Sequence, residues 1–422
     1  MLLGVYSRIA FSAGTDDGSE LWGYVEGASG VGFGNFQEIG PLDGNLKPRN
    51  STWLRKADLL FVDSPVGTGF SYMEDENLAV KTDDEAATDL TTLLQELFNG
   101  NESLQRSPLY IFAESYGGKF AVTLGLSALK AIEAGRLKLQ LGGVALGDSW
   151  ISPKDLVLSW GPLLKDMSRL DDTSLDSANR TFCFLFYFLF SQCNCLALKI
   201  KQQIAEGNIA DATQGFFDLE GIISAGRNDV DMYNFMLDSV NDPVEGQSTE
   251  GKIVDKYSKY LKKRISISPD GTDAIIPRLM NGPIKDKLKI IPKNVSWGGQ
   301  EGIVFPAMAG DFMRARVAEV DELLAKGISV TIYNGQIDLI CATKGAEALL
   351  QKLKWRGVKK FLSLPNTPLY CDNDDSVTKG FVRSYENLSF FWILGAGHFV
   401  PVDQPCVSFL MVGNVTRSPS QA

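Results

Sequence analysis

One serine in this sequence lies where a strand is expected to turn sharply into a helix. The apolar and aromatic run at residues 108–112 predicts a buried strand, and residues 118–129 predict a helix. Ser115 lies between them, with the small residues Ala113 and Gly117 two positions away on either side. Such a turn lifts a nucleophilic serine above the edge of a sheet. The same pattern also suits a serine that only caps a helix, so the motif alone leaves both interpretations open.

A catalytic serine needs a base, and the sequence holds a single histidine, His398. It lies in a glycine-rich segment after the apolar run at residues 390–394, which predicts a strand. Asp338 follows another predicted strand, residues 328–333. The order along the chain is serine, aspartate, histidine, which is the order of α/β-hydrolases. We therefore expect Ser115 to be a nucleophile, with His398 as its base and Asp338 as the third member of a triad.

The elements that must position these residues alternate between strands and helices. Strands are predicted at residues 21–26, 58–63, 108–112, 139–146, 328–333 and 388–394, and helices at residues 85–98, 118–129, 317–325, 346–354 and 406–412. This alternation predicts an α/β fold with a parallel sheet that is covered by helices. Helical patterns dominate residues 150–297, where we expect a helical cap inserted into a single domain that spans residues 1–422.

The glycine-rich segment at residues 27–35 is a candidate phosphate-binding loop. It lacks the Lys-Ser/Thr ending of a P-loop, and no acidic residue follows a second strand at the spacing of a dinucleotide site. With one histidine and no paired Cys-x-x-Cys spacing, a zinc site is not expected either. The sequence therefore predicts no cofactor and no metal.

Charge and hydrophobicity restrict the partners of the chain. The 51 acidic residues outnumber the 41 basic ones, and the resulting net charge of −10 argues against nucleic acid. The longest apolar run, residues 182–190, is shorter than the roughly 18 to 20 residues that span a bilayer. That run is apolar on every face. It could be a substrate-facing patch, an element that touches a membrane or, as we favour, a foreign insertion.

The six cysteines and six Asn-x-Ser/Thr sites favour a protein of the secretory pathway, either secreted or in a vacuole or lysosome. N-glycans are then expected on sites among Asn50, Asn101, Asn179, Asn294, Asn387 and Asn414. The first residues do not form a convincing signal peptide, so we infer that the start of the chain is incomplete. Six cysteines allow fifteen pairings, of which we predict Cys341 with Cys371. A homodimer is left open.

Six short segments carry a more specific signal. They are Gly-Asn-Phe-Gln-Glu-Ile-Gly-Pro at residues 34–41, Val-Asp-Ser-Pro-Val-Gly-Thr-Gly-Phe-Ser-Tyr at 62–72, Glu-Ser-Tyr-Gly-Gly at 114–118, Gly-Val-Ala-Leu-Gly-Asp-Ser-Trp at 143–150, Tyr-Asn-Gly-Gln-Ile-Asp at 333–338 and Gly-His-Phe-Val-Pro-Val-Asp-Gln-Pro at 397–405. Together they resemble the serine carboxypeptidase family, which has the α/β-hydrolase fold. The resemblance covers nearly the whole chain after residue 27. It is greatest to the plant serine carboxypeptidase-like and animal retinoid-inducible branch.

This resemblance implies acyl transfer, with the C-termini of peptides or proteins as substrates. Ser115 attacks the last peptide carbonyl, His398 takes and returns the proton, and Asp338 holds the imidazole tautomer. The backbone N–H of Tyr116, the residue after the nucleophile, is one expected oxyanion donor.

The resemblance also implies a site for the C-terminal carboxylate of the substrate. Glu114 matches the family glutamate that helps to bind it. Two carboxylates can meet only if they share a proton, which requires a raised pKa and favours acidic pH. The partner acid of the family corresponds to Gln37 in this sequence, with Glu38 beside it.

The main departure from the family lies at Gly27. In the family an apolar strand ends in Gly-Gly-Pro-Gly, where a glycine N–H completes the oxyanion hole. Here residues 21–26 run directly into Gly27, the last glycine of that motif. Two edge strands and one central strand look absent, which we expect to open the sheet. The loss of one oxyanion donor lowers the rate about 100- to 1000-fold.

Three functions are therefore open. The favoured one is a serine-type carboxypeptidase. The second is a serine carboxypeptidase-like acyltransferase that uses sugar-ester donors. The third is a truncated, catalytically impaired variant that acts as a non-enzymatic protein.

Overall fold

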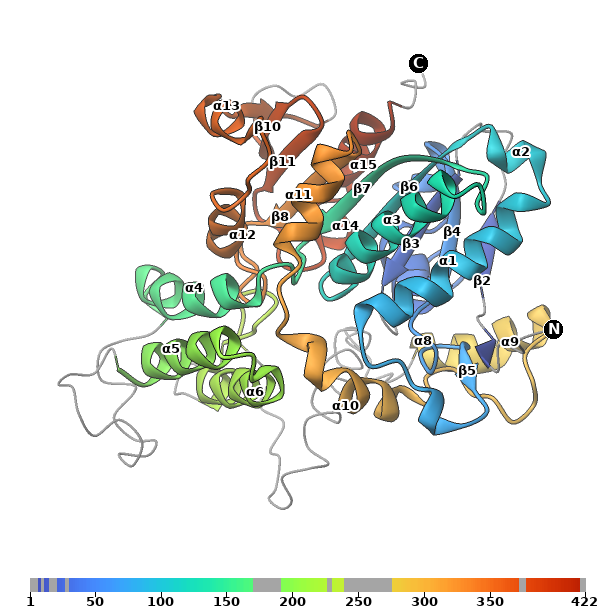
Figure 1. Cartoon of the computed structure of the whole chain (residues 1–422), viewed down its shortest axis with the longest axis horizontal. Helices are drawn as coiled ribbons and strands as arrows, with labels where there is room; N and C mark the ends of the chain where they lie inside the picture. The colour runs from blue at the N-terminus through green and yellow to red at the C-terminus, as the bar shows by residue number, and fades with distance from the viewer. Residues whose placement is uncertain are drawn as a thin grey trace.

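The computed structural model contains a mixed sheet with helices on both faces (Figure 1). It describes residues 7–8, 11–14, 21–26, 30–169, 191–225, 230–238, 275–371 and 377–417. Three features discussed above lie outside these ranges, namely Gly27, the apolar run at residues 182–190 and the glycosylation site Asn179.

The strands of the main sheet are β2 Phe11–Gly14, β3 Leu21–Glu26, β4 Asp58–Asp63, β6 Pro108–Glu114, β7 Gln140–Gly147, β8 Ser329–Gly335, β9 Thr367–Leu369, β10 Gly380–Tyr385 and β11 Leu388–Ile393. Their order is β2-β4-β3-β6-β7-β8-β11-β10-β9. Neighbours from β4 to β11 run parallel, whereas β2 at one edge and β10 and β9 at the other pair antiparallel. A separate small pair joins β1 Ser7–Arg8 to β5 Tyr72–Met73. The predicted parallel sheet is thus confirmed.

Strand β3 lies inside the sheet, between β4 and β6. Its residues Leu21–Glu26 pair with Asp58–Asp63 of β4, and Leu21–Tyr24 pair with Leu109–Phe112 of β6. The expectation that the sheet is open here is therefore wrong, because the segment directly before Gly27 fills the position. A short segment can do this since pairing in a parallel sheet uses only backbone N–H and C=O groups.

The helices are α1 Asp83–Asn99, α2 Glu102–Gln105, α3 Gly117–Glu133, α4 Pro153–Asp166, α5 Ser191–Ala205, α6 Ile209–Ala225, α8 Ile275–Leu279, α9 Lys285–Leu288, α10 Glu301–Phe312, α11 Val317–Ala325, α12 Thr343–Leu350, α13 Val358–Ser363, α14 Val400–Asp403 and α15 Pro405–Thr416. Shorter or wider helical turns are η1 Gly30–Ile39, η2 Trp53–Arg55, η3 Glu76–Leu78 and η4 Met280–Ile284. The predicted glycine-rich loop at residues 27–35 is thus helical from Gly30 onward. The apolar side chains within this helical segment hold it against the core, because Val31, Phe33 and Phe36 are all buried there.

Helix α1 shows how the local sequence sets a helix. The hydroxyl of Thr82 accepts a hydrogen bond from the N–H of Glu85 at 3.2 Å, which caps the first turn. Three acidic residues, Asp83, Asp84 and Glu85, lie in that turn and interact favourably with the helix dipole. Leu90, Leu94 and Phe98 recur at helical spacing and are buried against the sheet.

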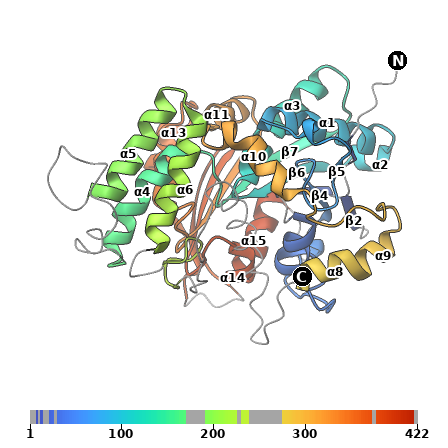
Figure 2. The ribbon, with the colours of Figure 1, turned by 90° about the horizontal axis from the view of Figure 1, so that it is seen from below.

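Alternate side chains of the central strands enter two hydrophobic clusters. In β6, Leu109 and Ile111 pack with residues of α1, α3 and α11, whereas Tyr110 and Phe112 pack with residues of α15. Figure 2 shows the corresponding layers, with α1, α3 and α11 on one side of the sheet and α14 and α15 on the other. Helices α4, α5 and α6 pack against one another at one end. They lie within the region predicted as a cap, whose limits at residues 150 and 297 stay a prediction.

The cysteine pairing differs from the prediction. Cys371 is bonded to Cys406 at the start of α15, with their Cα atoms 6.1 Å apart, and Cys341 is a buried free thiol. The predicted Cys341–Cys371 bond is therefore wrong. Cys341 follows β8 and faces the interior, whereas Cys371 lies beyond β9 at the edge of the sheet. Cys195 also forms a disulfide.

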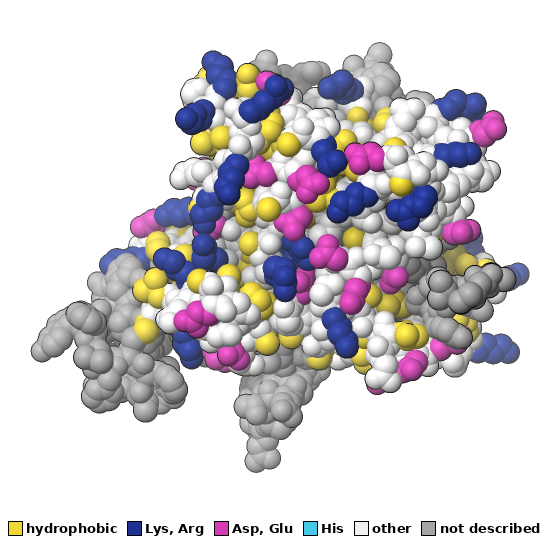
Figure 3. All heavy atoms as spheres, viewed as in Figure 1, with side chains coloured by type: hydrophobic (Ala, Val, Ile, Leu, Met, Phe, Trp, Pro, Cys, Tyr) yellow, Lys and Arg dark blue, Asp and Glu magenta, His cyan; other side chains and the backbone are white. Residues whose placement is uncertain are grey.

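The surface carries charges of both signs. On the face shown in Figure 3, lysine and arginine side chains are interspersed with aspartate and glutamate, and neither sign forms a continuous field. Within the described ranges, no helix has the length and apolar character needed to cross a membrane.

Candidate active site

The turn between β6 and α3 holds Ser115 in a left-handed backbone conformation. Its φ is +57°, which is uncommon for a residue other than glycine and typical of functional turns. The Ser115 N–H donates to the carbonyl oxygen of Gly147 at 3.0 Å, and the N–H of Trp150 donates to the Ser115 carbonyl oxygen at 2.9 Å. These bonds tie the sharp turn to the end of β7.

A glycine lets α3 begin close to the loop after β7. A Cβ atom on Gly118 would lie 2.4 Å from the Cβ of Ser149, a separation that real Cβ atoms do not show. A larger residue at position 118 would therefore displace either the helix or Ser149, and with it the turn that presents Ser115.

His398 and Asp338 form a buried hydrogen-bonded pair. The Nδ1 atom of His398 lies 2.9 Å from Oδ2 of Asp338, and the two residues are 1% and 0% exposed. The other carboxylate oxygen of Asp338 accepts a hydrogen bond from the N–H of Cys341 at 3.3 Å. The backbone N–H of His398 donates to the carbonyl oxygen of Tyr233 at 2.8 Å, and the Tyr233 ring lies edge-on to the imidazole at 4.7 Å. The imidazole is thus fixed on two sides.

Ser115, Asp338 and His398 all lie at one edge of the sheet. They follow the carboxyl ends of β6, β8 and β11. These three strands run parallel, and with β7 they are consecutive in the sheet, in the order β6-β7-β8-β11. Tyr233 connects them, since its ring contacts His398 and also lines the pocket of Ser115. Among the described residues, Ser115 Oγ makes no hydrogen bond to the imidazole. Such bonds are often long in enzymes without substrate and tighten when substrate binds.

A largely aromatic pocket opens beside Ser115. Its lining comprises Ser115, Tyr116, Trp150, Phe216, Phe217, Glu220, Tyr233, Phe305, Phe312 and Ile340. Helices α6 and α10 contribute the phenylalanines, so the pocket lies between the sheet edge and the helices that follow β7. Such a lining suits an apolar group, with Glu220 as the one charged residue.

Tyr116 is anchored to a buried network of charges. Its ring stacks on Phe312 at 5.4 Å, and its hydroxyl donates to Oδ1 of Asp83 at 2.7 Å. Asp83 also pairs with Lys119 at 3.3 Å and with Arg316 at 2.9 Å. Burial raises the pKa of Asp83 and lowers the pKa of Lys119, although each lies beside an opposite charge.

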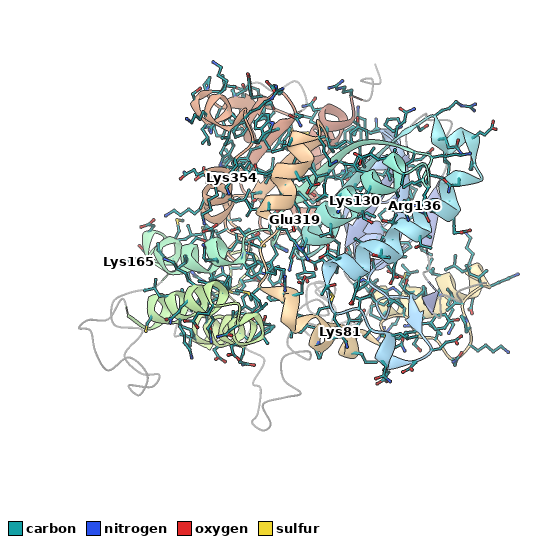
Figure 4. All side chains as sticks on the ribbon, viewed as in Figure 1. Lys81, Lys130, Arg136, Lys165, Glu319 and Lys354 are labelled. Carbon is teal, nitrogen blue, oxygen red and sulfur yellow. A yellow bond between two sulfur atoms is a disulfide. The ribbon has the colours of Figure 1, made fainter. Side chains whose placement is uncertain are left out.

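Three further carboxylates belong to this network, and Asp84 pairs with Arg316 at 3.1 Å. Asp311 pairs with both Lys119 and Arg316, and Glu319 pairs with Arg316 at 3.0 Å. Figure 4 labels Glu319 on α11. The predictions above do not include this network. Lys119 is a signal of it in the sequence, because this lysine lies among the apolar residues at the start of α3, where a buried charge needs a partner.

The three candidates for the substrate carboxylate differ in burial. Glu114 and Glu38 are 0% and 1% exposed, whereas Gln37 is half-buried. The guanidinium of Arg49 donates to the carbonyl oxygen of Gln37 at 2.9 Å, and the charge of Glu38 acts on this arginine. Of these two neighbours within η1, the structure thus buries Glu38 more fully than Gln37.

Asp338, Cys341 and His398 also place potential metal-ligand atoms within 4.8 Å of one another. The hydrogen bond between Asp338 and His398 already uses two of those atoms. Burial raises the pKa of the Cys341 thiol well above its usual value, and the nearby carboxylates of Asp338, Asp148 and Glu114 raise it further. The thiol is therefore neutral at physiological pH, and this arrangement suits proton transfer better than metal binding.

Comparison with known proteins agrees with this geometry. The profile of the serine carboxypeptidase family matches residues 27–418, so the match begins at Gly27. Serine carboxypeptidase-like 51 of Arabidopsis thaliana is 52% identical over 446 residues, which cover 96% of this chain and 93% of that protein. The retinoid-inducible serine carboxypeptidase of Homo sapiens is 40% identical over 451 residues, with 99% and 96% covered. Both alignments exceed the 422 residues of this chain, as expected if the chain lacks a segment of the family.

A solved structure shows the same fold. A prohormone-processing carboxypeptidase from Saccharomyces cerevisiae superposes with a TM-score of 0.76 at 21% identity, over 97% of this chain and 87% of that one. At this identity the likeness establishes the fold, which is the α/β-hydrolase fold predicted from the sequence. By its family match and its identity to these relatives, this chain belongs to the serine carboxypeptidase family, whose members are hydrolases of the serine-protease type.

Proposed function

We propose that this chain releases C-terminal residues from peptides through an acyl-enzyme intermediate on Ser115. The family match supports the reaction class. The observation that carries the residue roles is the hydrogen bond between Asp338 and Nδ1 of His398. Because it engages Nδ1, it leaves Nε2 to accept a proton from the serine.

The proposed reaction has two halves. Ser115 Oγ attacks the last peptide carbonyl while His398 Nε2 takes its proton, and the imidazolium then gives that proton to the leaving amino acid. Water, deprotonated by His398, then hydrolyses the ester and frees the shortened peptide. The N–H of Tyr116 stabilises the oxyanion in both halves. A contribution from Gly27 stays a prediction.

Glu114 and Glu38 are the proposed binders of the substrate's free carboxylate. Both are fully buried, and their elements, β6 and η1, flank the region of Ser115. Of the two sequence candidates for the partner acid, burial favours Glu38 over Gln37. A carboxylic acid that donates to a substrate carboxylate must be protonated, so we expect binding to weaken as the pH rises.

The aromatic pocket is the proposed site for an apolar substrate side chain. Its phenylalanines from α6 and α10 offer apolar surface within reach of Ser115. Removal of an apolar side chain from water contributes about 25 cal/mol for each Å² that is buried. We therefore expect peptides with large apolar residues beside the scissile bond to be preferred. No described contact favours transfer to another acceptor over hydrolysis.

Labelling with a serine-directed fluorophosphonate probe tests the nucleophile. We expect Ser115 to be modified, and Ser115→Ala and His398→Ala each to abolish labelling. Ser384→Ala is a matched control, because this exposed serine lies on β10 and its hydroxyl hydrogen-bonds to the hydroxyl of Ser389 on the neighbouring strand. Folded protein that stays unlabelled at Ser115 would refute the enzyme assignment for this chain.

Hydrolysis of blocked dipeptides tests the specificity. We expect release of the C-terminal residue from a blocked dipeptide with a free carboxylate, and none from the same dipeptide as an amide. Glu114→Gln and Glu38→Gln should raise KM more than they lower kcat, because they remove carboxylate binding. Cleavage of the amide at the same rate, or acyl transfer from a glucose ester in place of hydrolysis, would contradict the proposal.

We also propose that the chain matures in the secretory pathway. The disulfide between Cys371 and Cys406 supports an oxidising compartment. Four Asn-x-Ser/Thr asparagines are exposed and accessible to glycosylation, namely Asn50, Asn101, Asn294 and Asn414. Sensitivity of the secreted protein to an N-glycosidase would support this, and purely cytoplasmic protein with reduced cysteines would contradict it.

A further inference from the structure

Asp148 is a buried aspartate at the end of β7, between the strand that leads to Ser115 and the strand that leads to Asp338. It is 0% exposed, and its φ of +39° is unusual for a residue other than glycine. Its N–H donates to the carbonyl oxygen of Tyr333 at 2.8 Å, which holds it against β8. A strained and fully buried acid at this edge of the sheet points to a role in the site.

The Asp148 carboxyl organises the start of the Asp338 loop. Its Oδ1 atom accepts hydrogen bonds from the N–H of Gly335 at 2.8 Å and from Nδ2 of Asn334 at 3.1 Å. Asn334 Nδ2 also donates to the carbonyl oxygen of Cys341 at 2.6 Å. The carboxyl is therefore linked to both ends of the segment that carries Asp338.

The second oxygen of Asp148 has a different environment. Oδ2 is buried and has no hydrogen-bond partner within the described part of the chain, and the carboxyls of Asp148 and Asp338 are close enough to interact. Asp338 already interacts with Nδ1 of His398 and with the N–H of Cys341. Two adjacent carboxylates cannot both be ionised in a buried site. Since Asp338 lies against the imidazole, the shared proton belongs on Asp148.

The other ionisable groups around this pair agree with that assignment. Burial, and next the charge of Asp338, raise the pKa of Asp148 well above its usual value, and Asp403 on α14 raises it further. Acids therefore surround Asp148, and its neutral form is favoured.

We infer that Asp148 is a positioning residue, protonated on Oδ2, whose hydrogen bond to Asp338 holds that carboxylate toward His398. This inference rests on the proposed roles of Asp338 and His398. The proton on Asp148 has two effects. It removes the repulsion between two buried acids, and it leaves Asp338 with one negative charge that orients and stabilises the imidazolium of His398.

Because the chain has one histidine, the pKa of His398 can be followed by NMR after ¹⁵N-histidine labelling without ambiguous assignment. Asp148→Asn keeps the shape, the acceptor for Gly335 and a donor to Asp338, so the pKa of His398 should stay as in the parent chain. An ionised Asp148 would give a different result. Its replacement by a neutral amide would then lower the pKa of His398 by about one unit or more, since it removes a negative charge. That result would overturn the inference, and the measurement does not depend on catalysis.

Kinetics with a blocked dipeptide supply a second readout. Asp148→Ala should lower kcat about 10- to 100-fold with little change in KM, because it disturbs the triad and not substrate binding. Asp148→Asn should recover most of the lost kcat. Asp321→Asn is the control, since Asp321 also accepts backbone N–H bonds, from Lys354 and Trp355, but lies on α11. Equal impairment in the alanine and asparagine variants, or none in either, would refute the role, and if the alanine variant does not fold, the NMR titration still decides.

Discussion

Replacement of Lys119 by methionine tests the buried charge network below Tyr116. Lys119 is 0% exposed, and its ammonium lies 3.3 Å from Asp83 and 3.6 Å from Asp311. It also donates to the carbonyl oxygens of Asp311 at 2.6 Å and of Phe312 at 3.2 Å. The loss of one partner of a buried ion pair costs about 3 to 5 kcal/mol. Because Arg316 still pairs with Asp83, we expect the low end, about 3 kcal/mol, in the free energy of unfolding.

Urea unfolding followed by tryptophan fluorescence measures this change. Lys130→Met is the matched control, because Lys130 is an exposed lysine on the same helix α3 (Figure 4). A surface substitution of this kind changes the free energy of unfolding by about 0.5 kcal/mol or less. We also expect slower fluorophosphonate labelling, since Asp83 holds the hydroxyl of Tyr116. A Lys119→Met variant as stable as the control would refute the idea that this network supports the nucleophile turn.

Three further outcomes follow from the structure. Removal of the Cys371–Cys406 bond by two alanine substitutions should lower the free energy of unfolding by about 3 to 4 kcal/mol, from the entropy of a loop of 35 residues, and an unchanged urea midpoint would contradict this. Burial raises the pKa of Asp63 from its usual value of 3.8 to about 8. The protonated form therefore contributes most to the free energy of unfolding below pH 3.8, and this contribution is lost as the pH rises through 8. Urea midpoints of the parent chain should therefore fall relative to Asp63→Asn between pH 5 and 8, and parallel curves would show that Asp63 is ionised throughout. Mass spectrometry of the secreted protein should find no glycan on Asn387, because its Nδ2 already donates to the carbonyl oxygens of Leu324 and Ile328, and glycan occupancy there would show that this contact is not formed.

The parallel sheet was predictable because its central strands are buried on both faces. Such strands form continuous apolar runs, as at residues 108–112, and these runs stand out in the sequence. The triad candidates were predictable for a related reason. A single histidine and an aspartate that each follow a strand must lie at the same sheet edge as Ser115.

Other features depend on contacts between distant segments, which the sequence does not show. The bond between Cys371 and Cys406 depends on how α15 packs beside the sheet, and spacing along the chain carries no trace of it. The insertion of residues 21–26 between β4 and β6 is equally hidden, since backbone pairing is nearly independent of side-chain identity. Asp148 was missed because its motif position gives no hint that its carboxyl accepts hydrogen bonds from Asn334 and Gly335, at the start of the segment that carries Asp338.

The order of the strands has a consequence for how the chain folds. β7 ends at Gly147 and β8 begins at Ser329, yet the two are neighbours in the sheet. Contacts between residues so far apart in sequence form late, because the intervening chain must first be closed into a loop. The half of the sheet with Ser115 can therefore assemble before the half with Asp338 and His398 joins it. A chain that is still being synthesised would carry its proposed nucleophile without the proposed base, and we expect it to be inert toward neighbouring polypeptides until its last third has docked.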